Sequence, residues 1–322
     1  MPNQTPETDS KTPTTDALAQ HSPSIARIVA GVSEQWAEHA TFIERRFAND
    51  DPAFLSHCES LADDILQLTG ENLAEYCADY RWMCDEFVKE EIFFRRNKRY
   101  RLSTLREAQE SVYDNPEFMK RYMFGLLISQ ILWRNHASVF DSYLVDFLGP
   151  QKQTFRHLEV GPGHGLFLHH AANHPLCEAA HGWDISDTSL GTTEHALSAL
   201  KSDHKVKLER RDIAQDDTHD HEFDTVVASE LLEHVEQPES VLDGLIRVMR
   251  PGGQIFINVP VNSPAPDHIY LWTSPGDVIA MIENAGLEVI RSHQFPATGV
   301  SLEQARKARL TISTVIIGRR PN

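Results

Sequence analysis

The chain has 322 residues, with 47 acidic and 30 basic side chains and a formal net charge of -17 at pH 7. This length suits two domains, or one domain with a large extension, and 41% hydrophobic residues can form a sizeable core. The negative charge disfavours nonspecific binding to nucleic acid or to an anionic membrane. No apolar run approaches the ~18 residues that cross a bilayer, and no secretory signal is visible, so we expect a cytoplasmic protein.

The first half of the chain passes from a polar segment to a helical pattern. Residues 1–24 are rich in Pro, Thr, Ser and Asp and are expected to form a disordered tail. Residues 25–150 carry apolar side chains at helical spacing, without a good strand candidate, and predict an all-helical N-terminal cap. The expected helices are residues 25–47, 52–68, 73–94 and 116–148.

After Gly149 and Pro150, short strand-like runs alternate with helical stretches. The expected strands are residues 155–160, 182–185, 205–210, 223–229, 254–260, 287–293 and 310–318. Such alternation is typical of an α/β fold and predicts a doubly wound, Rossmann-like, mostly parallel sheet over residues 151–322. The last two runs have only a modest connection between them and could pair as an antiparallel edge.

The first expected strand ends in the sequence EVGPGHG, residues 159–165. Three glycines there let the backbone turn tightly and approach a ligand closely. A dinucleotide site has the pattern G-x-G-x-x-G, but Leu166 stands where its third glycine would be. Pro162 and the acidic Glu159 also fit poorly with a bound phosphate, whereas an acidic group suits the cationic cofactor S-adenosylmethionine.

Two further carboxylates follow the next strands. Asp184 ends the second strand, nineteen residues after Gly165, where a carboxylate can accept hydrogen bonds from ribose hydroxyls. Asp212 follows the third strand, where it could accept from an adenine amino group, with Ile213 beside the ring. Each aspartate alone could also be a helix N-cap, and Asp184 would suit NAD equally well. Their order at three consecutive strand ends favours a ligand site.

These motifs give residues 155–318 a resemblance to class I S-adenosylmethionine-dependent methyltransferases. The matching segments are LEVGPGHG (158–165), GWDIS (182–186), RDI (211–213), FDTVVASELLEHVEQPESVL (223–242) and VMRPGGQIFINVP (248–260). The resemblance implies a seven-stranded sheet with a reversed terminal strand, and S-adenosylmethionine as cofactor. The residues it places at the cofactor are Glu159, Gly161, Pro162, Gly163, Gly165, Asp184, Ile185, Asp212, Ile213, Glu230 and Leu231.

The residues that bind the methyl acceptor should lie near the ends of the fourth and fifth strands or on the cap. His234, in the segment ELLEHVEQP, is a candidate general base for an alcohol or phenol, or only shapes the pocket. Asn135 and His136, on the last cap helix, are further catalytic candidates. The expected substrate-binding residues are Tyr122, Gln130, Trp133, Asn262, His268 and Tyr270.

Two clusters of charged or metal-binding side chains stand apart from these motifs. Arg95, Arg96, Lys98, Arg99 and Arg101 form the one concentrated basic run, which could receive the acidic surface of a carrier protein or simply pair with nearby glutamates. His164, His169, His170 and His174 follow the glycine turn, but no metal-binding motif accompanies them, so we predict no metal.

The sequence thus predicts a methyltransferase that acts on a small molecule, in secondary metabolism. Four alternative functions remain open. The enzyme could cyclise S-adenosylmethionine and release methylthioadenosine, or it could methylate RNA or protein by docking it on the basic run. The chain could also bind the cofactor without catalysis, or it could be an NAD oxidoreductase.

Overall fold

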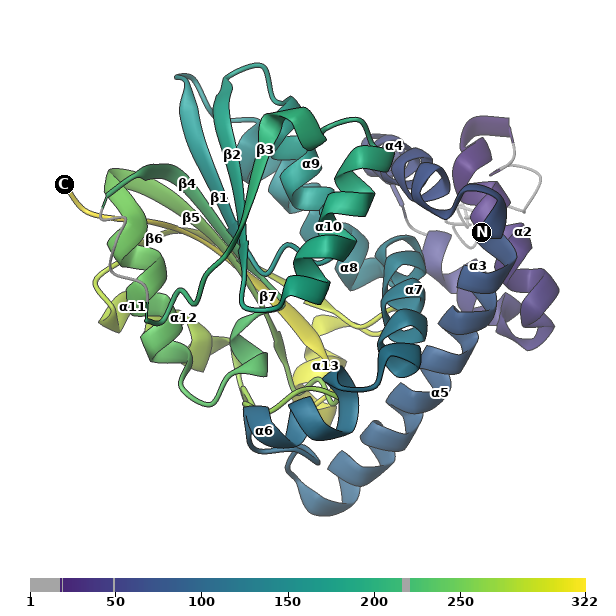
Figure 1. Cartoon of the computed structure of the whole chain (residues 1–322). Helices are drawn as coiled ribbons and strands as arrows, with labels where there is room; N and C mark the ends of the chain where they lie inside the picture. The colour runs from purple at the N-terminus through teal and green to yellow at the C-terminus, as the bar shows by residue number, and fades with distance from the viewer. Residues whose placement is uncertain (1–17, 19, 49, 216–220) are drawn as a thin grey trace, which may run out of the picture.

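A computed structural model describes residues 18, 20–48, 50–215 and 221–322 (Figure 1). Most of the expected tail, residues 1–17 and 19, lies outside the described residues. The end of that segment differs from expectation, because Leu18 is 5% exposed and packs into the core of the N-terminal helices, and helix α2 begins at Pro23. Within the described ranges, no helix is long and apolar enough to cross a membrane.

The N-terminal half is helical, as the sequence predicts. Its elements are α2 (Pro23–Gln35), η1 (Ala37–His39), α3 (Ala40–Phe47), α4 (Pro52–Thr69), η2 (Gly70–Asn72), α5 (Leu73–Asn97), α6 (Leu105–Ala108), η3 (Gln109–Tyr113), α7 (Pro116–Leu132), α8 (Arg134–Ser142) and η4 (Tyr143–Leu148). The long helix α5 runs along one side of the molecule and packs against α2 and α7 (Figure 1). Buried side chains such as Ile28, Ile65, Met83 and Ile128 form the shared core of this helical cap.

Two of the expected helices are each divided at a tryptophan. Trp36 (φ -151°, ψ 77°) ends α2, and Trp133 (φ -95°, ψ 116°) separates α7 from α8. Both indoles turn toward the fully buried Tyr80 of α5, whose hydroxyl accepts a 3.1 Å hydrogen bond from Trp133 Nε1. The apolar pattern continues across both breaks, so periodicity alone could not show them.

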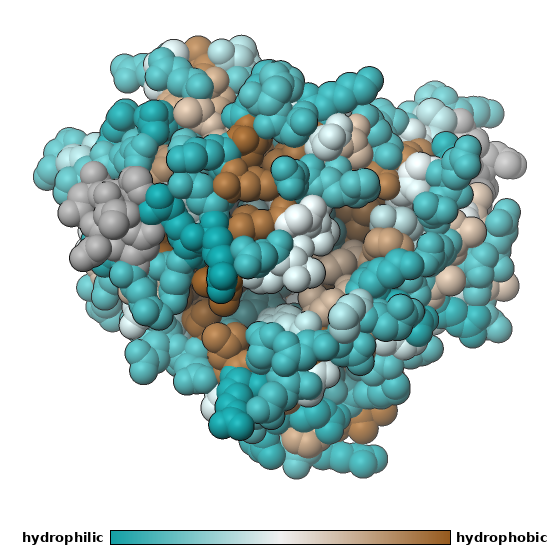
Figure 2. All heavy atoms as spheres, in the orientation of Figure 1, coloured by the Kyte–Doolittle hydropathy of each residue, from teal (hydrophilic) through white to brown (hydrophobic). Residues whose placement is uncertain are grey.

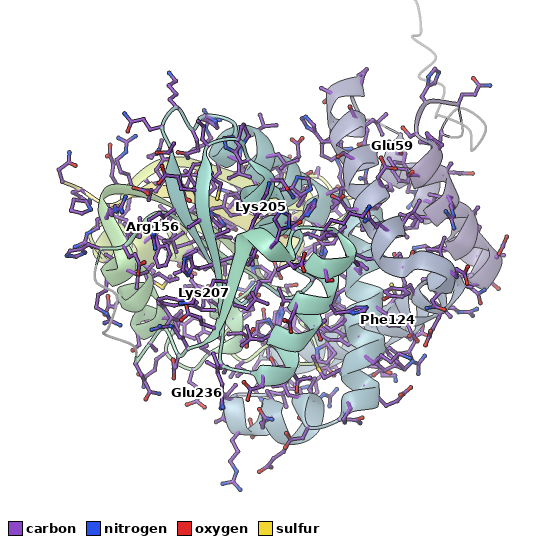
Figure 3. The ribbon with its side chains drawn as sticks, turned by 45° about the horizontal axis from the view of Figure 1, so that its top comes forward. Glu59, Phe124, Arg156, Lys205, Lys207 and Glu236 are labelled. Atoms are coloured by element: carbon purple, nitrogen blue, oxygen red, sulfur yellow. The ribbon has the colours of Figure 1, made fainter. Side chains whose placement is uncertain are left out.

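A short helical segment that we did not expect connects α5 to α7. Thr104 and Glu107 form a capping box that starts α6, and the π-helical turn η3 follows directly. The Leu105 amide donates a 2.9 Å hydrogen bond to Glu236 Oε1, which lies beside α6 in Figure 3. This contact fixes the segment to the sheet domain.

The C-terminal half contains the predicted seven-stranded sheet. Its strands are β1 (Phe155–Val160), β2 (Cys177–Asp184), β3 (Val206–Arg210), β4 (Phe223–Ser229), β5 (Met249–Val261), β6 (Glu288–Pro296) and β7 (Ile312–Arg319). They lie in the order β3-β2-β1-β4-β5-β7-β6. All neighbours are parallel except β7, which is antiparallel to both β5 and β6. The doubly wound fold class and the antiparallel edge are therefore confirmed.

The remaining helices lie between the strands. They are α9 (Leu166–Asn173), α10 (Asp187–Ala199), η5 (Asp203–Lys205), η6 (Leu232–His234), α11 (Pro238–Val248), α12 (Pro275–Asn284) and α13 (Leu302–Ala308). Helix α9 starts directly after the glycine turn, and α10 starts after β2. Both helix starts therefore border the carboxyl ends of the central strands, where a doubly wound sheet binds ligands.

The last helix before the expected boundary at residue 150 packs against both the cap and the sheet. Helix α8 contacts β6 and β7, and Val139, Tyr143 and Phe147 form one buried cluster with Phe155 and Phe256 of the sheet. The last segment of the expected cap is therefore a layer of the sheet domain. Its apolar pattern was visible in the sequence, but the surface that it covers was not.

Candidate active site

The turn after β1 has the conformation that its glycines predict. Gly161, Gly163 and Gly165 have φ angles of 72°, 50° and 70°, in the left-handed region that favours glycine. The Gly161 amide donates to the Trp183 carbonyl at 2.8 Å, and the Gly165 amide donates to the Pro162 carbonyl at 2.7 Å. Because a phosphate-binding turn directs its amides at the ligand, this internal pairing counts against a dinucleotide.

Glu159 lies at the end of β1, directly before this turn. Its side chain is 2% exposed, and burial raises the pKa of its carboxyl group well above the ordinary value. Its Oε2 atom has no hydrogen-bond partner among the described residues. Since a buried, unpartnered carboxyl oxygen is costly, a cationic ligand group beside it would be stabilising.

Asp184 and Asp212 lie at the ends of β2 and β3, as expected, and both accept hydrogen bonds from the residues that follow. Asp184 Oδ1 accepts from the Ser186 amide and Oδ2 from the Ser189 hydroxyl, each at 2.8 Å. Burial raises the pKa of Asp184. Asp212 Oδ1 accepts from the Ala214 amide at 3.0 Å. Each carboxylate stabilises the turn after its strand and keeps further lone pairs for a ligand.

The two isoleucines expected at the cofactor have different surroundings. Ile185 is 53% exposed next to Asp184 and is accessible to a ligand. Ile213 is only 4% exposed and belongs to the buried cluster that contains Leu242 and Leu245 of α11. The Ile213 side chain therefore contributes to the core, and its contact with an adenine ring stays a prediction.

The end of β4 approaches the glycine turn. Glu230 has a φ of 52°, which is uncommon for a residue with a Cβ atom. Its Oε1 accepts a 2.7 Å hydrogen bond from Asn258 Nδ2, and burial raises its pKa to about 7. Leu231 lies so close to Gly161 that a Cβ atom on that glycine would come 3.1 Å from Leu231 Cδ1. The expected residues of β1 and β4 are thus brought together.

His234 lies among acidic and phenolic side chains. Its Nδ1 atom is 3.2 Å from the Tyr113 hydroxyl and 3.2 Å from the Asp267 carbonyl, and its Nε2 atom is 3.6 Å from Glu233 Oε1. The Tyr122 hydroxyl donates to Asp267 Oδ1 at 2.9 Å, and the Tyr113 hydroxyl donates to Oδ2 at 3.4 Å. Residues from the cap therefore meet the loops after β4 and β5 at this histidine.

The cluster around His234 is strongly acidic and buried. Glu233 is fully buried, and burial together with the charge of Glu230 raises its pKa well above the ordinary value. Burial raises the pKa of Tyr113, and the nearby charges of Asp267, Glu233 and Asp184 raise it further. The charge of the aspartate after β2 therefore also acts on this tyrosine of the cap.

His268 completes the cluster but is unsuited to be a base. Its ring lies 5.0 Å from that of His234, and its Nδ1 donates a 2.7 Å hydrogen bond to the Ser263 carbonyl. The Tyr100 hydroxyl accepts from the Ser263 amide at 3.0 Å. Burial lowers the pKa of His268 to about 4, so this imidazole stays neutral near pH 7.

The two catalytic candidates on α8 make contacts within the protein, and their catalytic role stays a prediction. Asn135 Nδ2 donates a 3.0 Å hydrogen bond to Ser313 Oγ of β7, which ties the helix to the sheet. His136 Nδ1 is 3.0 Å from Ser129 Oγ, and burial lowers the pKa of this imidazole to about 3. His136 is therefore too weak a base to accept a proton near neutral pH. Its contact with Ser129 joins α8 to α7 across the helix break at Trp133.

Three expected substrate-binding residues are likewise engaged within the protein. Gln130 Nε2 donates to the Leu126 carbonyl at 3.4 Å, and Asn262 Nδ2 donates to the Thr273 carbonyl at 3.1 Å. The Tyr270 ring packs on a neighbouring indole, with ring centroids 4.6 Å apart. Trp133 lies at the helix break described above. Of the substrate-binding set, Tyr122 and His268 are the two that reach the His234 cluster.

Several residues of the His234 cluster were not predicted from the sequence. Glu233 stands directly before His234, and its spacing of three from Glu230 was the available signal. Asp267 precedes His268, but nothing local distinguishes it from a loop aspartate. The cluster residues that the sequence argument missed are Tyr100, Tyr113, Glu233, Asn258 and Asp267.

The basic run at the end of α5 is partly paired with glutamates. Arg95 pairs with Glu91 at 2.5 Å, and Arg101 pairs with Glu90 at 2.9 Å. Lys98 lies instead at a surface hollow of about 350 Å³, where the ends of α5 and α13 meet. The hollow is lined by Phe94, Arg95, Lys98, Lys307, Ala308 and Arg309.

Comparison with known proteins identifies the class of the C-terminal half. Residues 158–255 match the family model described as a methyltransferase domain. Together with the sheet order, this match confirms the resemblance of the C-terminal half to the class I methyltransferase family. The matched residues include the glycine turn, both strand-end aspartates and His234.

Curated relatives match this chain over part of their own length. An enzyme named ubiquinone biosynthesis O-methyltransferase, from Azoarcus sp. (strain BH72), is 28% identical, over 41% of this chain and 64% of its own. A phosphatidylethanolamine N-methyltransferase of Cereibacter sphaeroides is 33% identical, over 34% of this chain and 56% of its own. This chain therefore spans less than two thirds of either relative. A solved S-adenosylmethionine-dependent methyltransferase from Aquifex aeolicus superposes with a TM-score of 0.44 at 16% identity, over 66% of this chain and 97% of its own.

Proposed function

We propose that the protein is an S-adenosylmethionine-dependent methyltransferase that acts on an oxygen nucleophile of a small molecule, in secondary metabolism. The observation that carries this proposal is the placement of His234 among Tyr113, Tyr122 and Asp267, close to the cofactor-type turn after β1. The curated relatives support methyl transfer to oxygen or nitrogen, and a histidine base favours an acceptor that must lose a proton.

The strand-end residues suit S-adenosylmethionine better than NAD. Glu159 provides an unpartnered buried carboxyl oxygen for a cationic ligand, and Asp184 retains lone pairs for ribose hydroxyls. When bound, S-adenosylmethionine supplies an electrophilic methyl group. The turn offers little to a pyrophosphate, because the amides of Gly161 and Gly165 already donate to carbonyls of the protein. Calorimetry with NAD and S-adenosylmethionine side by side tests this preference.

His234 can accept the proton of the acceptor. When its Nδ1–H donates to the Asp267 carbonyl, the Nε2 lone pair is free to take a proton. The imidazolium that results would be stabilised by the Asp267 carboxylate, whose Oδ2 lies 3.5 Å from Nδ1. The acceptor oxygen would be held in line with the methyl group that S-adenosylmethionine supplies when bound, with S-adenosylhomocysteine as the leaving group. The surrounding side chains would exclude water from the site.

The cap and the sheet together provide the walls of the acceptor site. Figure 2 shows the surface hollowed between α10 and α7, with hydrophobic residues gathered beside the hollow. Tyr122 reaches the site from α7 and Tyr113 from η3, so the acceptor would enter between the cap and the loops after β4 and β5. We also propose an acidic carrier protein as a partner that docks at the basic run. Lys307 and Arg309 line the same hollow and add to the positive charge of the basic run.

Product analysis separates the alternatives. The purified chain is incubated with S-adenosylmethionine and a panel of phenols and catechols, and the nucleoside products are identified by mass spectrometry. S-adenosylhomocysteine formed only with an acceptor supports the proposal, whereas methylthioadenosine formed without one indicates cyclisation. Cofactor binding without turnover on any acceptor would point to a non-catalytic binding protein, and salt-dependent binding of tRNA with its methylation would point to an RNA methyltransferase.

A further inference from the structure

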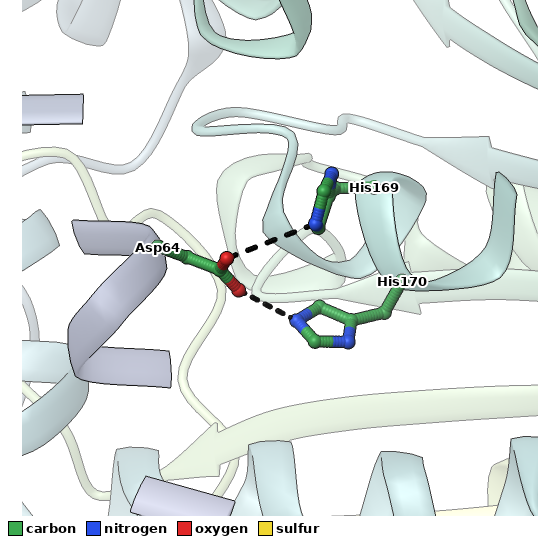
Figure 4. Close-up of side chains that lie close together, drawn as sticks. All are labelled: Asp64, His169 and His170. Carbon is green, nitrogen blue, oxygen red and sulfur yellow. Dashed lines mark hydrogen bonds and ion pairs between the residues drawn. The ribbon is translucent and has the colours of Figure 1, made fainter. Parts of the chain in front are cut away.

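A second polar cluster joins the cap to the sheet domain, away from the site of methyl transfer. Asp64 lies on α4 of the cap, whereas His169 and His170 lie on α9, the helix that follows the glycine turn. Their side chains are between 13% and 18% exposed, so the cluster is largely shielded but open to small solutes. Figure 4 shows both imidazoles directed at the two oxygens of the one carboxylate.

The ligand atoms of the three side chains converge. His170 Nε2 lies 2.8 Å from Asp64 Oδ2, and His169 Nε2 lies 3.8 Å from Asp64 Oδ1. All three side chains offer one ligand atom within 4.8 Å of the others. Zinc binds imidazole nitrogens and carboxylate oxygens at about 2.0–2.2 Å, so small side-chain adjustments would bring these atoms around one ion.

The surroundings of His169 leave its Nε2 atom facing the cluster. On its other side, Nδ1 contacts the Ser202 hydroxyl and lies 3.2 Å from the Asn173 amide group. When Nδ1 donates its proton to the serine, Nε2 and Asp64 Oδ1 face each other with no proton between them, at a separation too long for a hydrogen bond. An outer hydrogen bond that orients an imidazole in this way is typical of metal-binding histidines.

We propose that Asp64, His169 and His170 form a binding site for a divalent zinc-type metal ion that fastens α4 of the cap to α9. Water would complete a four-coordinate shell, since the cluster is partly open to solvent. This proposal departs from our expectation that the histidines after the glycine turn hold no metal.

One nearby charge opposes the metal and gives the proposal a distinctive consequence. The Lys205 ammonium group donates to Asn173 Oδ1 at 3.2 Å, and its positive charge acts on His169 (Lys205 is labelled in Figure 3). Removing this charge should therefore tighten metal binding severalfold. If the cluster only forms hydrogen bonds between the two helices, removing the charge of Lys205 would not change the affinity for metal.

The experiment uses the full chain, freed of metal with a chelator and dialysed. Zn²⁺ is titrated by calorimetry and Co²⁺ by visible absorption, for the wild type and for Asp64→Asn, His169→Gln, His170→Gln and Lys205→Gln. His195→Gln, on the exposed face of α10, is the matched histidine control. His234→Gln removes the other group that could hold a cation, formed by Glu233, His234 and His268.

We expect one equivalent of metal whose affinity falls at least tenfold in each of the three cluster variants and rises in Lys205→Gln. His195→Gln and His234→Gln should keep this equivalent. Metal should also raise the unfolding temperature of the wild type but not of the cluster variants, which are compared without metal to verify folding. The proposal is overturned if no metal binds, if the cluster variants bind as tightly as the wild type, or if only His234→Gln loses binding.

Discussion

The Tyr122 hydroxyl of α7 donates a 2.9 Å hydrogen bond to the carboxylate of Asp267, which lies 145 residues later in the loop after β5. Both side chains are buried, at 3% and 5% exposure, so this bond joins the cap to the site in a region without bulk water. Asp267 in turn faces His234. The position of the candidate base thus depends on a residue of the cap.

Replacing Tyr122 with phenylalanine should therefore affect stability and turnover together. The variant leaves Asp267 with one partner fewer in a buried setting, at a cost of about 1–3 kcal/mol in the free energy of unfolding, measured by urea denaturation. We expect turnover to fall about tenfold or more because Asp267 no longer holds His234 in place. Tyr80→Phe removes a buried tyrosine hydroxyl elsewhere in the cap. If Tyr80→Phe lowers turnover as strongly, the effect is one of general stability.

His234→Gln should reduce turnover by roughly 100-fold if the imidazole removes the proton of the acceptor. The loss should shrink for acceptors of low pKa, which ionise without help, and this is measured with a series of substituted phenols. His268→Gln is the comparison, because the low pKa of His268, about 4, already prevents it from acting as a base near pH 7. Equal losses in both variants for all phenols would show that His234 only shapes the site.

Asp184→Ala should weaken binding of S-adenosylhomocysteine by about 1–3 kcal/mol through lost hydrogen bonds to the ribose. The same carboxylate also accepts from Ser186 and Ser189 at the start of α10, so the variant has a structural cost as well. Ser189→Ala removes one of these internal bonds and keeps the carboxylate. Calorimetric affinity that is unchanged in Asp184→Ala, or reduced equally in Ser189→Ala, would contradict a ribose contact.

The buried carboxyl group of Glu230 predicts a stability that falls as pH rises. Its pKa is raised from 4.5 to about 7 in the folded protein, so its protonated form is favoured on folding. The stability contributed is fully present below pH 4.5 and is lost as pH rises through about 7, on the order of 3 kcal/mol. Urea unfolding at pH 5 and pH 8 should show a smaller pH difference for Glu230→Gln than for the wild type. The same difference in both proteins would refute the assignment.

The same carboxyl group predicts that the charged cofactor releases protons. A cation bound near Glu230 favours its ionised form, so S-adenosylmethionine should displace a fraction of a proton at pH 7. S-adenosylhomocysteine lacks the sulfonium charge and should displace less. Calorimetry in two buffers with different ionisation enthalpies measures both values. Equal proton release by the two ligands would place the sulfonium away from the buried carboxyl groups.

Much of the sheet could be predicted from sequence because its strands are continuous apolar runs that end at glycine or polar residues. The strands at residues 155–160 and 223–229 begin and end where expected, and the glycine turn has the left-handed geometry that its composition indicates. The helix breaks at Trp36 and Trp133 could not be predicted, because they depend on contacts with the distant Tyr80.

Only some residues of the candidate site could be predicted from the sequence, because the others come together through contacts between distant parts of the chain. His234 and Glu230 lie within one recognisable segment, so local pattern identifies them. Tyr113 and Asp267 are separated by 154 residues and meet only after the cap has packed on the sheet. Asn135, a polar side chain in an apolar helix, suggested a ligand contact, and its hydrogen-bond partner in β7 lies 178 residues away in the sequence, so local pattern could not indicate it.

The packing of α8 and η4 against the sheet has a consequence for how the protein folds. Val139, Tyr143 and Phe147 cover Phe155 and Phe256, so a fragment cut after Gly149 would expose one aromatic face of its own sheet. The chain segment that completes this face is synthesised before the first strand. The two halves of the protein should therefore unfold in a single cooperative transition in calorimetry. They should not unfold as two independent domains.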